Sequence, residues 1–246
     1  MALREQFESS GGWLFRWRGY VPLAIIALIV FVMRDFHYPG HSRQLNSLWE
    51  LACIAVSFFG LGIRAFTIGH TPRNTSGRNA REQRADSLTT SGIYSIVRHP
   101  LYLGNFFVYL GVVLFAHVWW LAVICVLAYW LYYERIMFAE EFYLRGKFGS
   151  AFEQWAERTP AFVPDLRLWQ PPDLPFSPKN VLRREYNNFF SVVLILFVLD
   201  CVGRYFAEGH IQLDQGWAIF LGVGFVIWIV LRTIKRNTEG LRVPGR

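Results

Sequence analysis

The chain is built from long apolar runs that alternate with shorter polar segments. The runs that stand out are residues 21–33, 51–63, 101–133, 189–202 and 216–231. About 20 apolar residues are enough for a helix to cross the hydrocarbon core of a membrane. The run at 101–133 is much longer than that, and polar His117 interrupts it, so we expect two helices that turn near residues 116–118. The pattern therefore predicts six membrane-spanning helices, several of them short.

The basic residues are distributed unevenly over the seven segments outside these predicted spans. The N-terminal segment, the second loop, the fourth loop and the C-terminal tail hold 3, 6, 8 and 5 of the 25 lysines and arginines. The first, third and fifth loops hold 2, 0 and 1. Because basic segments are retained on the cytoplasmic side, this alternation supports six spans. We expect an all-α integral membrane protein with both termini in the cytoplasm, in the inner membrane if the source is bacterial.

Composition supports this fold class and narrows the possible partners. Apolar residues form 53% of the chain and aromatic residues 17%, more than in an ordinary soluble domain. The formal charge of +7 suits a cytoplasmic face against anionic lipid, so it requires no nucleic-acid partner. The three cysteines lie inside predicted spans, and no spacing predicts a metal site. We expect one membrane domain, residues 1–246, in contact with the lipid bilayer; no protein partner can be inferred.

The segments outside the spans have local signals of their own. Residues 3–17 contain aromatic side chains, Phe15 among them, and are predicted to lie on the membrane surface. Pro100 suits the first turn of a helix, which would place His99 at its N-cap. The helical pattern of the fourth span continues to about Phe148. Six prolines at residues 160–178 predict an extended segment along the surface.

Tyr94, Arg98, His99 and Tyr102 lie close together in the sequence, just where an apolar helix is predicted to begin. Taken singly, the arginine is a lipid contact, the histidine a helix cap and the tyrosine an interfacial anchor. Taken together, they surround one loop-to-helix junction. Such a junction can hold an adenosine-sized group by stacking and hydrogen bonding.

A second group of polar residues follows the fourth predicted span. Glu140 and Glu141 lie among apolar neighbours, which argues against an ordinary solvated pair on a surface helix. A carboxylate held there suits the ribose hydroxyls, the amino group or the sulfonium of a cationic cofactor. Arg135, at the expected membrane boundary, has the planar guanidinium that binds an anionic head group in a bidentate manner. We expect the tyrosine–histidine corner and the acidic pair to converge in one cavity.

Several common signatures of enzymes are missing from the sequence. No G-x-G-x-x-G follows a predicted strand, and there is no Walker loop, no His-Glu-x-x-His and no nucleophile elbow. A Rossmann domain, a P-loop and a zinc protease are therefore not expected.

With these residues in view, the chain resembles the isoprenylcysteine carboxyl methyltransferase and phospholipid methyltransferase family. The resemblance covers roughly residues 70–166, the methyltransferase core, and leaves two additional helices at residues 186–234 outside it. It depends on Thr-Ser-Gly-Ile-Tyr-Ser-Ile-Val-Arg-His-Pro-Leu-Tyr-Leu-Gly (90–104), the paired glutamates and Thr-Pro-Ala-Phe-Val-Pro (159–164). The longer pattern, including residues 74–79 and 132–137, is similar to bacterial members that methylate the 1-phosphate of lipid A.

The resemblance implies S-adenosyl-L-methionine as the cofactor, held without a Rossmann domain. The implied cofactor-binding residues are Tyr94, His99, Pro100, Leu101, Tyr102 and Glu140, with looser matches at Asn79, Leu88 and Thr89. The substrate-facing arginine of the family falls here on Ile136, so that Arg135 is one residue away from it. The candidates for the catalytic role are Arg135, Arg98 and Glu141.

The favoured hypothesis is methyl transfer to an oxygen of an anionic membrane lipid. Prenylcysteine carboxyl methylation and phosphatidylethanolamine N-methylation remain as alternatives, and the latter requires a glutamate as base. A sterol or enone reductase that uses NADPH is a rival from another class, since the arginines at 78, 81 and 84 suit its 2′-phosphate. A membrane protein without catalytic activity is the remaining alternative.

Overall fold

The computed structural model describes residues 3–17, 19–72, 85–210 and 213–245. Within these residues the chain forms eight α-helices and short 3-10 turns, which confirms the predicted all-α fold. The helices are α1 (Leu3–Trp17), α2 (Val21–Val32), α3 (Arg43–His70), α4 (Pro100–Leu114), α5 (Trp119–Phe148), α6 (Ser150–Arg158), α7 (Pro178–Glu208) and α8 (Gln215–Asn237). The 3-10 turns are Met33–Asp35, Pro39–His41, Ile93–Ser95 and Leu166–Leu168.

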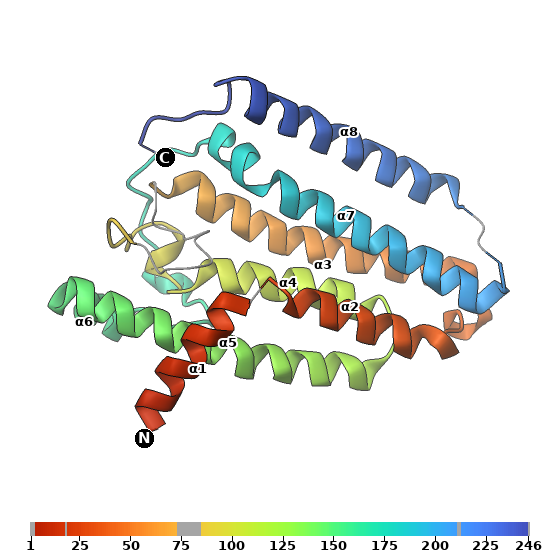
Figure 1. Ribbon diagram of the computed structural model, residues 1–246, viewed down its shortest axis with the longest axis horizontal. Helices are drawn as coiled ribbons and strands as arrows, with labels where there is room; N and C mark the ends of the chain where they lie inside the picture. Colours follow the sequence, from red (N-terminus) through yellow and green to blue (C-terminus); the bar gives the residue numbers. More distant parts are fainter. Residues whose placement is uncertain (1–2, 18, 73–84, 211–212, 246) are drawn as a thin grey trace.

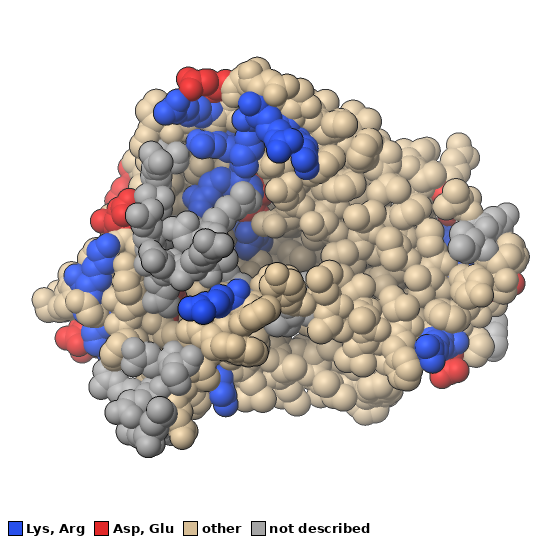
Figure 2. Space-filling view, viewed as in Figure 1, with Lys and Arg blue, Asp and Glu red and all other residues tan. Residues whose placement is uncertain are grey.

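Six of the helices, α2, α3, α4, α5, α7 and α8, run side by side as a bundle, and α1 is inclined against it (Figure 1). Both termini lie at one end of the bundle, here called the terminal end, and the short connections between helices lie at the opposite, hairpin end. Charged side chains gather at these two ends, whereas the middle of the visible face is almost uncharged (Figure 2). This distribution is that of a protein whose middle lies in hydrocarbon.

Four helices, α3, α5, α7 and α8, are long and apolar enough to cross a membrane. Helices α2 and α4 follow the same direction as the bundle but have only 12 and 15 residues. Six spans therefore stay a prediction. The turn near residues 116–118 is confirmed, because α4 ends at Leu114 and α5 begins at Trp119. His117 has a φ of 58° there, and its Nε2 donates a hydrogen bond to Asn46 Oδ1 at 3.0 Å.

The predicted helix boundaries around the polar residues are confirmed as well. Helix α4 begins at Pro100 with His99 as its N-cap. Helix α5 continues to Phe148 and ends at Gly149, whose φ of 54° suits glycine. Apart from the 3-10 turn Leu166–Leu168, residues 160–177 have no helix, as the prolines predicted.

Helix α1 packs against α5, and this contact changes the environment predicted for one of its aromatic residues. Phe15 was expected to enter the membrane surface, but it is buried against Tyr129, Tyr133 and Ile136 of α5. The aromatic face of α5 offers it a protein surface with which to pack. Trp13 remains exposed and available for lipid.

Helices α3 and α4 approach each other closely because glycines lie between them. A methyl group at Gly60 would collide with the carbonyl oxygen of Gly104, and one at Gly111 would collide with Ser57 and the carbonyl of Cys53. Small residues at such contacts let helix backbones approach in membranes, where apolar burial supplies little driving force. This contact fixes the position of α4, and with it the start of α4 at the terminal end.

A buried polar network ties α3, α7 and α8 together at the hairpin end. Arg204 donates from Nε to both carboxylate oxygens of Asp200, at 2.8 and 2.9 Å, and both side chains are less than a tenth exposed. Glu50 accepts from Asn46 at 2.7 Å and from the Trp217 indole at 3.3 Å. Charged side chains that are buried to this extent are stable only while they remain paired.

Replacing Asp200 by Ala should destabilise the protein, because it removes the carboxylate that accepts from Nε of the buried Arg204 guanidinium. Breaking a buried ion pair from one side costs about 3–5 kcal/mol. The control is Glu239→Ala, which removes an ion pair with Arg242 whose side chains are 80% and 67% exposed; its cost should stay under about 0.5 kcal/mol. Thermal unfolding in detergent measures both. Equal losses in the two variants would contradict the structural role of the pair.

Candidate active site

The start of α4, the last third of α5 and the end of α6 meet at the terminal end of the bundle. Glu141 lies at the centre of this meeting point, because its Oε1 faces both Arg98 Nε at 2.8 Å and His99 Nε2 at 3.0 Å. Tyr102 donates from its hydroxyl to Glu140 Oε2 at 2.9 Å. The expected contact of the tyrosine–histidine corner with the acidic pair is therefore confirmed, and a cavity shared by them stays a prediction.

Arg98 ties the start of α4 to the end of α6 and to the residues that follow it. Its Nη1 donates to the carbonyl oxygens of Ala156 at 2.5 Å and Thr159 at 2.8 Å, while its Nε is bound to Glu141. Its backbone N–H also donates to Pro160, at 2.9 Å. These bonds favour Arg98 as a residue that positions the site. Its role in binding an acceptor anion stays a prediction.

His99 lies at the N-cap of α4, yet its side chain makes no capping hydrogen bond. The buried imidazole instead stacks on Tyr102, with ring centroids 5.6 Å apart and an angle of 18°. Its Nδ1 lies 3.6 Å from Glu140 Oε2, so the ring is placed between the two glutamates. Burial by itself would lower the pKa of His99, but the hydrogen bonds and charges of Glu140 and Glu141 outweigh burial and raise it.

Tyr94 belongs to the 3-10 turn Ile93–Ser95 on the other side of the corner. Trp155 of α6 donates from its indole to the Tyr94 carbonyl at 3.0 Å, which holds the turn in place. Burial and the charge of Glu140 raise the pKa of the Tyr94 hydroxyl, while Arg184 and Arg64 act in the opposite direction. The Tyr94 hydroxyl is thus in electrostatic range of one carboxylate and two guanidinium groups.

The structure does not bring Arg135 to this cluster. Its guanidinium lies 5.3 Å from the centre of the Phe7 ring of α1, on an exposed face of α5. The next residue, Ile136, is fully buried in the core. A direct role for Arg135 at the acidic pair is therefore not supported by its position.

The other predicted cofactor residues lie at the start of α4 or in the segments before it. Pro100 is buried at the start of α4, and Leu101 is half-buried beside it. Leu88 and Thr89 are half-buried in the irregular segment before the corner. Asn79 lies outside the described residues.

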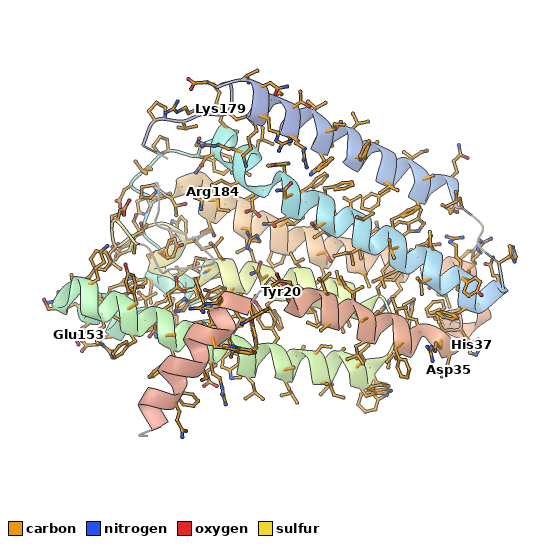
Figure 3. All side chains as sticks on the ribbon, viewed as in Figure 1. Tyr20, Asp35, His37, Glu153, Lys179 and Arg184 are labelled. Carbon is orange, nitrogen blue, oxygen red and sulfur yellow. The ribbon has the colours of Figure 1, made fainter. Side chains whose placement is uncertain are left out.

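Sequence reasoning missed two charged residues that the structure places beside the corner. Arg64 of α3 donates from Nε and Nη2 to Glu185 of α7, each at 2.8 Å, and from Nη1 to Asn105 of α4 at 2.7 Å. Arg184 lies next to Glu185, at the terminal end of α7 (Figure 3). Arg64 directly follows an apolar run, where a charged residue usually serves function. That signal was available in the sequence.

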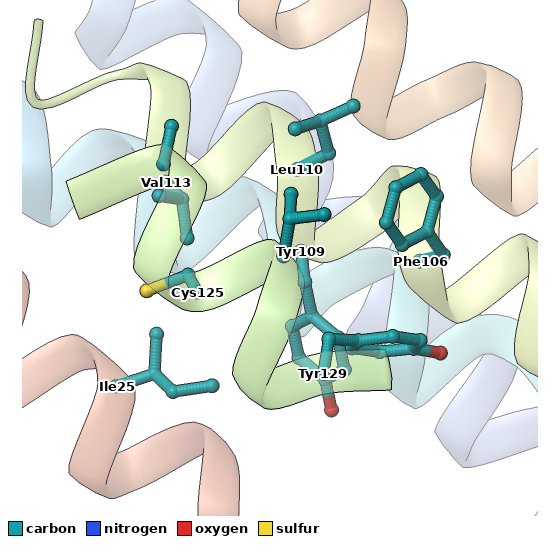
Figure 4. Close-up of a pocket in the computed structure, with 9 residues that line it drawn as sticks. Ile25, Phe106, Tyr109, Leu110, Val113, Cys125 and Tyr129 are labelled. Atoms are coloured by element: carbon teal, nitrogen blue, oxygen red, sulfur yellow. The ribbon is translucent and has the colours of Figure 1, made fainter. Parts of the chain in front are cut away.

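An apolar pocket adjoins the corner at membrane depth (Figure 4). It is small, and it is lined by one residue of α2, four of α4 and four of α5. Tyr129 lies at one side of the pocket, and its hydroxyl donates to the Tyr102 carbonyl at 2.6 Å. The pocket and the polar corner are therefore connected through consecutive turns of α4.

Among the described residues, no group of three or more histidine, cysteine, aspartate or glutamate side chains could hold a metal ion. The corner offers carboxylates, tyrosine hydroxyls, an imidazole and aromatic ring faces.

Comparisons with known proteins match the same part of the chain. Residues 46–151 match the family model described as phospholipid methyltransferase. The nickel-cobalt-cadmium resistance protein NccN of Alcaligenes xylosoxydans xylosoxydans is 31% identical over 154 residues, or 63% of this chain and 65% of that protein. The cobalt-zinc-cadmium resistance protein CzcN of Cupriavidus metallidurans is 29% identical over 143 residues, or 58% and 63%.

An enzyme is also among the relatives. The protein-S-isoprenylcysteine O-methyltransferase of Schizosaccharomyces pombe is 27% identical over 119 residues, which is 48% of this chain and 50% of that protein. The chain thus covers less than two thirds of the length of these three relatives. No solved structure matches significantly. The matches confirm the family resemblance: residues 46–151 of the chain are similar to the phospholipid methyltransferase family, and relatives that are named as methyltransferases match as well.

Proposed function

We propose that the protein transfers a methyl group from S-adenosyl-L-methionine to an oxygen of an anionic lipid head group. A phosphate like the 1-phosphate of lipid A is the favoured acceptor. The observation that carries this proposal is the contact between the His99–Tyr102 corner of α4 and the acidic pair of α5. It lies within the family match, at one end of an apolar bundle.

The residues of the corner fit the proposed cofactor. The Glu140 side chain is 30% exposed, so that its carboxylate can be reached from outside the fold, and it lies beside the ring of Tyr102. A carboxylate suits a cationic amino group or sulfonium, and a tyrosine ring suits an adenine face. When bound, S-adenosyl-L-methionine supplies a methyl group on a sulfonium, whose carbon–sulfur electrons leave with the sulfur as an acceptor oxygen attacks the carbon.

The chain itself then holds the cofactor and the acceptor in the geometry that the transfer requires. A phosphate or carboxylate oxygen is a nucleophile at neutral pH, so no residue needs to remove a proton. Glu141, bound by Arg98 and His99, positions the corner and is not required as a base. Holding two reactants in a productive geometry supplies ~7–11 kcal/mol of a barrier. Arg98, whose bonds reach α5 and α6, keeps that geometry rigid.

Carboxyl methylation of a prenylated cysteine is the second candidate. The relative from Schizosaccharomyces pombe bears the name of that activity, and a carboxylate meets the same chemical requirement as a phosphate. Phosphatidylethanolamine N-methylation has less support from the site, because its base would have to be a glutamate that already accepts hydrogen bonds. No comparison supports the NADPH reductase, and its arginines at 78, 81 and 84 lie outside the described residues.

The apolar pocket favours a lipid over a water-soluble acceptor. Its lining is formed by Phe106, Leu110 and similar side chains of α4 and α5, at the level of the uncharged middle of the bundle. A hydrocarbon chain in this pocket would leave its head group near Tyr102. This arrangement serves an acyl chain and a prenyl chain equally well.

Product analysis tests the proposed function directly. Membranes from cells that contain the protein, supplied with a methyl donor labelled with heavy isotope, should accumulate a labelled lipid that has lost one negative charge. Mass spectrometry of total lipid detects it, and membranes without the protein serve as the control. A labelled lipid that is methylated on its amine nitrogen and keeps its phosphate charge would show N-methylation instead. No labelled lipid or prenylcysteine product would contradict the proposal.

Glu140→Gln should weaken binding of S-adenosyl-L-methionine. The substitution keeps the size of the side chain but removes the charge that faces the cationic cofactor. A hydrogen bond to a charged group is worth ~1.5–3 kcal/mol, which corresponds to a loss of affinity of roughly 10- to 100-fold. Calorimetry in detergent measures it. Glu134→Gln, an exposed residue of the same helix, is the matched control and should bind as the wild type does.

The stability of the corner should depend on pH through His99. Because folding raises its pKa, protonated His99 stabilises the fold fully below its unfolded pKa of about 6.5, and this contribution is lost as the pH rises through the folded pKa. The thermal midpoint of the wild type should therefore fall more steeply above neutral pH than that of His99→Gln. Parallel curves for the two proteins would refute the coupling between His99 and the glutamates.

A further inference from the structure

The segment that follows α6, residues 159–164, lies directly against the polar corner. The backbone N–H of Arg98 donates to the Pro160 carbonyl at 2.9 Å, and that of His99 donates to the Ala161 carbonyl at 3.2 Å. Both bonds join main chain to main chain. The backbone of this segment therefore holds the backbone of the corner whatever side chains the segment carries.

The next residue, Phe162, packs between α4 and α5. Its ring centre lies 5.8 Å from that of Phe106 on α4 and 5.3 Å from that of Trp130 on α5, at interplanar angles of 87° and 88°. Both contacts have the edge-to-face geometry that aromatic pairs prefer. Phe162 is half-buried, whereas the following Val163 is 71% exposed. The segment thus places the ring of Phe162 against the bundle at a fixed point beside the corner.

Phe106 connects Phe162 to the apolar pocket. It is the first of the four α4 residues that line the pocket, and it follows Tyr102 of the corner by about one helical turn. The ring of Tyr129 lies 5.4 Å from that of Phe106 at 68°, and the Tyr129 hydroxyl donates to the Tyr102 carbonyl. Phe106 therefore forms the end of the pocket nearest the corner, with the rings of Phe162 and Tyr129 in contact with it.

We propose that Phe162 is a positioning residue for the methyl acceptor, because it holds Phe106 as the wall where the hydrocarbon chain of a lipid ends and its head group begins. The inference rests on the proposed function and adds a residue that selects the acceptor by the fit of its chain. The pocket is small, so the position of one ring in its wall changes which chain it accepts. Phe162 lies beyond residue 151, outside the family match.

Phe162→Ala tests this role, and Phe190→Ala is the matched control. Phe190 of α7 is also half-buried and also contacts two rings, those of Phe225 and Trp228 at 5.9 and 5.1 Å, but it does not line the pocket. Both substitutions remove a phenyl ring with two aromatic partners. A loss that is specific to Phe162→Ala therefore does not come from weakened packing in general.

The probe is phosphatidic acid in phosphatidylcholine nanodiscs, with a photoreactive diazirine at the end of one acyl chain. In the wild type, irradiation should label Val113, which lines the pocket and is buried from the surrounding lipid. Exposed Leu127 on α5 is the internal standard for contact with bulk lipid. Mass spectrometry of peptides should show that Phe162→Ala lowers the ratio of label at Val113 to label at Leu127 roughly tenfold, in line with the loss of two edge-to-face ring contacts.

The affinity for S-adenosyl-L-methionine separates a positioning role from a merely structural one. Phe162→Ala keeps the main-chain bonds of residues 160 and 161, so calorimetry should give the cofactor affinity of the wild type. Phe162→Leu, which keeps apolar volume but not the ring edges, should show intermediate labelling of Val113 and carries the test if Phe162→Ala does not fold. Labelling as in the wild type, an equal loss in Phe190→Ala, or a parallel loss of cofactor affinity would overturn the proposal.

Methyl transfer, followed with the labelled donor in the same membranes, distinguishes failure of this role from failure of the proposed function. If the wild type transfers a methyl group but labelling of Val113 does not depend on Phe162, the role of Phe162 is refuted and the proposed function stands. If labelling depends on Phe162 but no methyl group is transferred, the proposed function is refuted, and the placement of a lipid chain by Phe162 stands.

Discussion

The fold at the terminal end depends on one carboxylate, that of Glu141, and its contact with two consecutive residues at the start of α4. Arg98 and His99 both reach Oε1 of Glu141, and Arg98 extends the connection to carbonyls at the end of α6. These groups lie at the end of an apolar bundle, where unpaired charge would be costly. Because they satisfy one another, the chain can keep polar side chains at the edge of hydrocarbon and hold Glu140 and Tyr102 beside them.

The site is assembled from helices whose spacing is set elsewhere. Glycines between α3 and α4 fix how closely these helices approach, and the aromatic face of α5 packs on α4 through Tyr129 and Tyr133. The network around Arg204 and Asp200 closes the opposite end of the bundle. Packing in the apolar middle thus determines where the polar groups meet, and hydrogen bonds at each end determine their exact orientation.

Sequence patterns predicted the fold well where the signal was local. A proline after His99, a glycine after Phe148 and a histidine in a long apolar run each marked a helix boundary that the structure confirms. Contacts between side chains on different helices were harder to predict from the sequence. The segment that contains Phe15 has the composition of a membrane anchor. The burial of Phe15 is explained only by its packing against α5. Arg135 matched the expected chemistry, but the direction in which its side chain leaves α5 could not be read from spacing alone.

The ion pair of Arg64 and Glu185 shows why contacts between distant parts of the chain were the hardest to predict. These residues are separated by 121 positions, and no short motif contains both. The polar corner, by contrast, is contained in one motif and one acidic pair, so the sequence alone could indicate it. A buried ion pair contributes little net stability compared with apolar side chains of similar size. A guanidinium held at the junction of three helices is therefore better explained by a need for positive charge at that point than by stability.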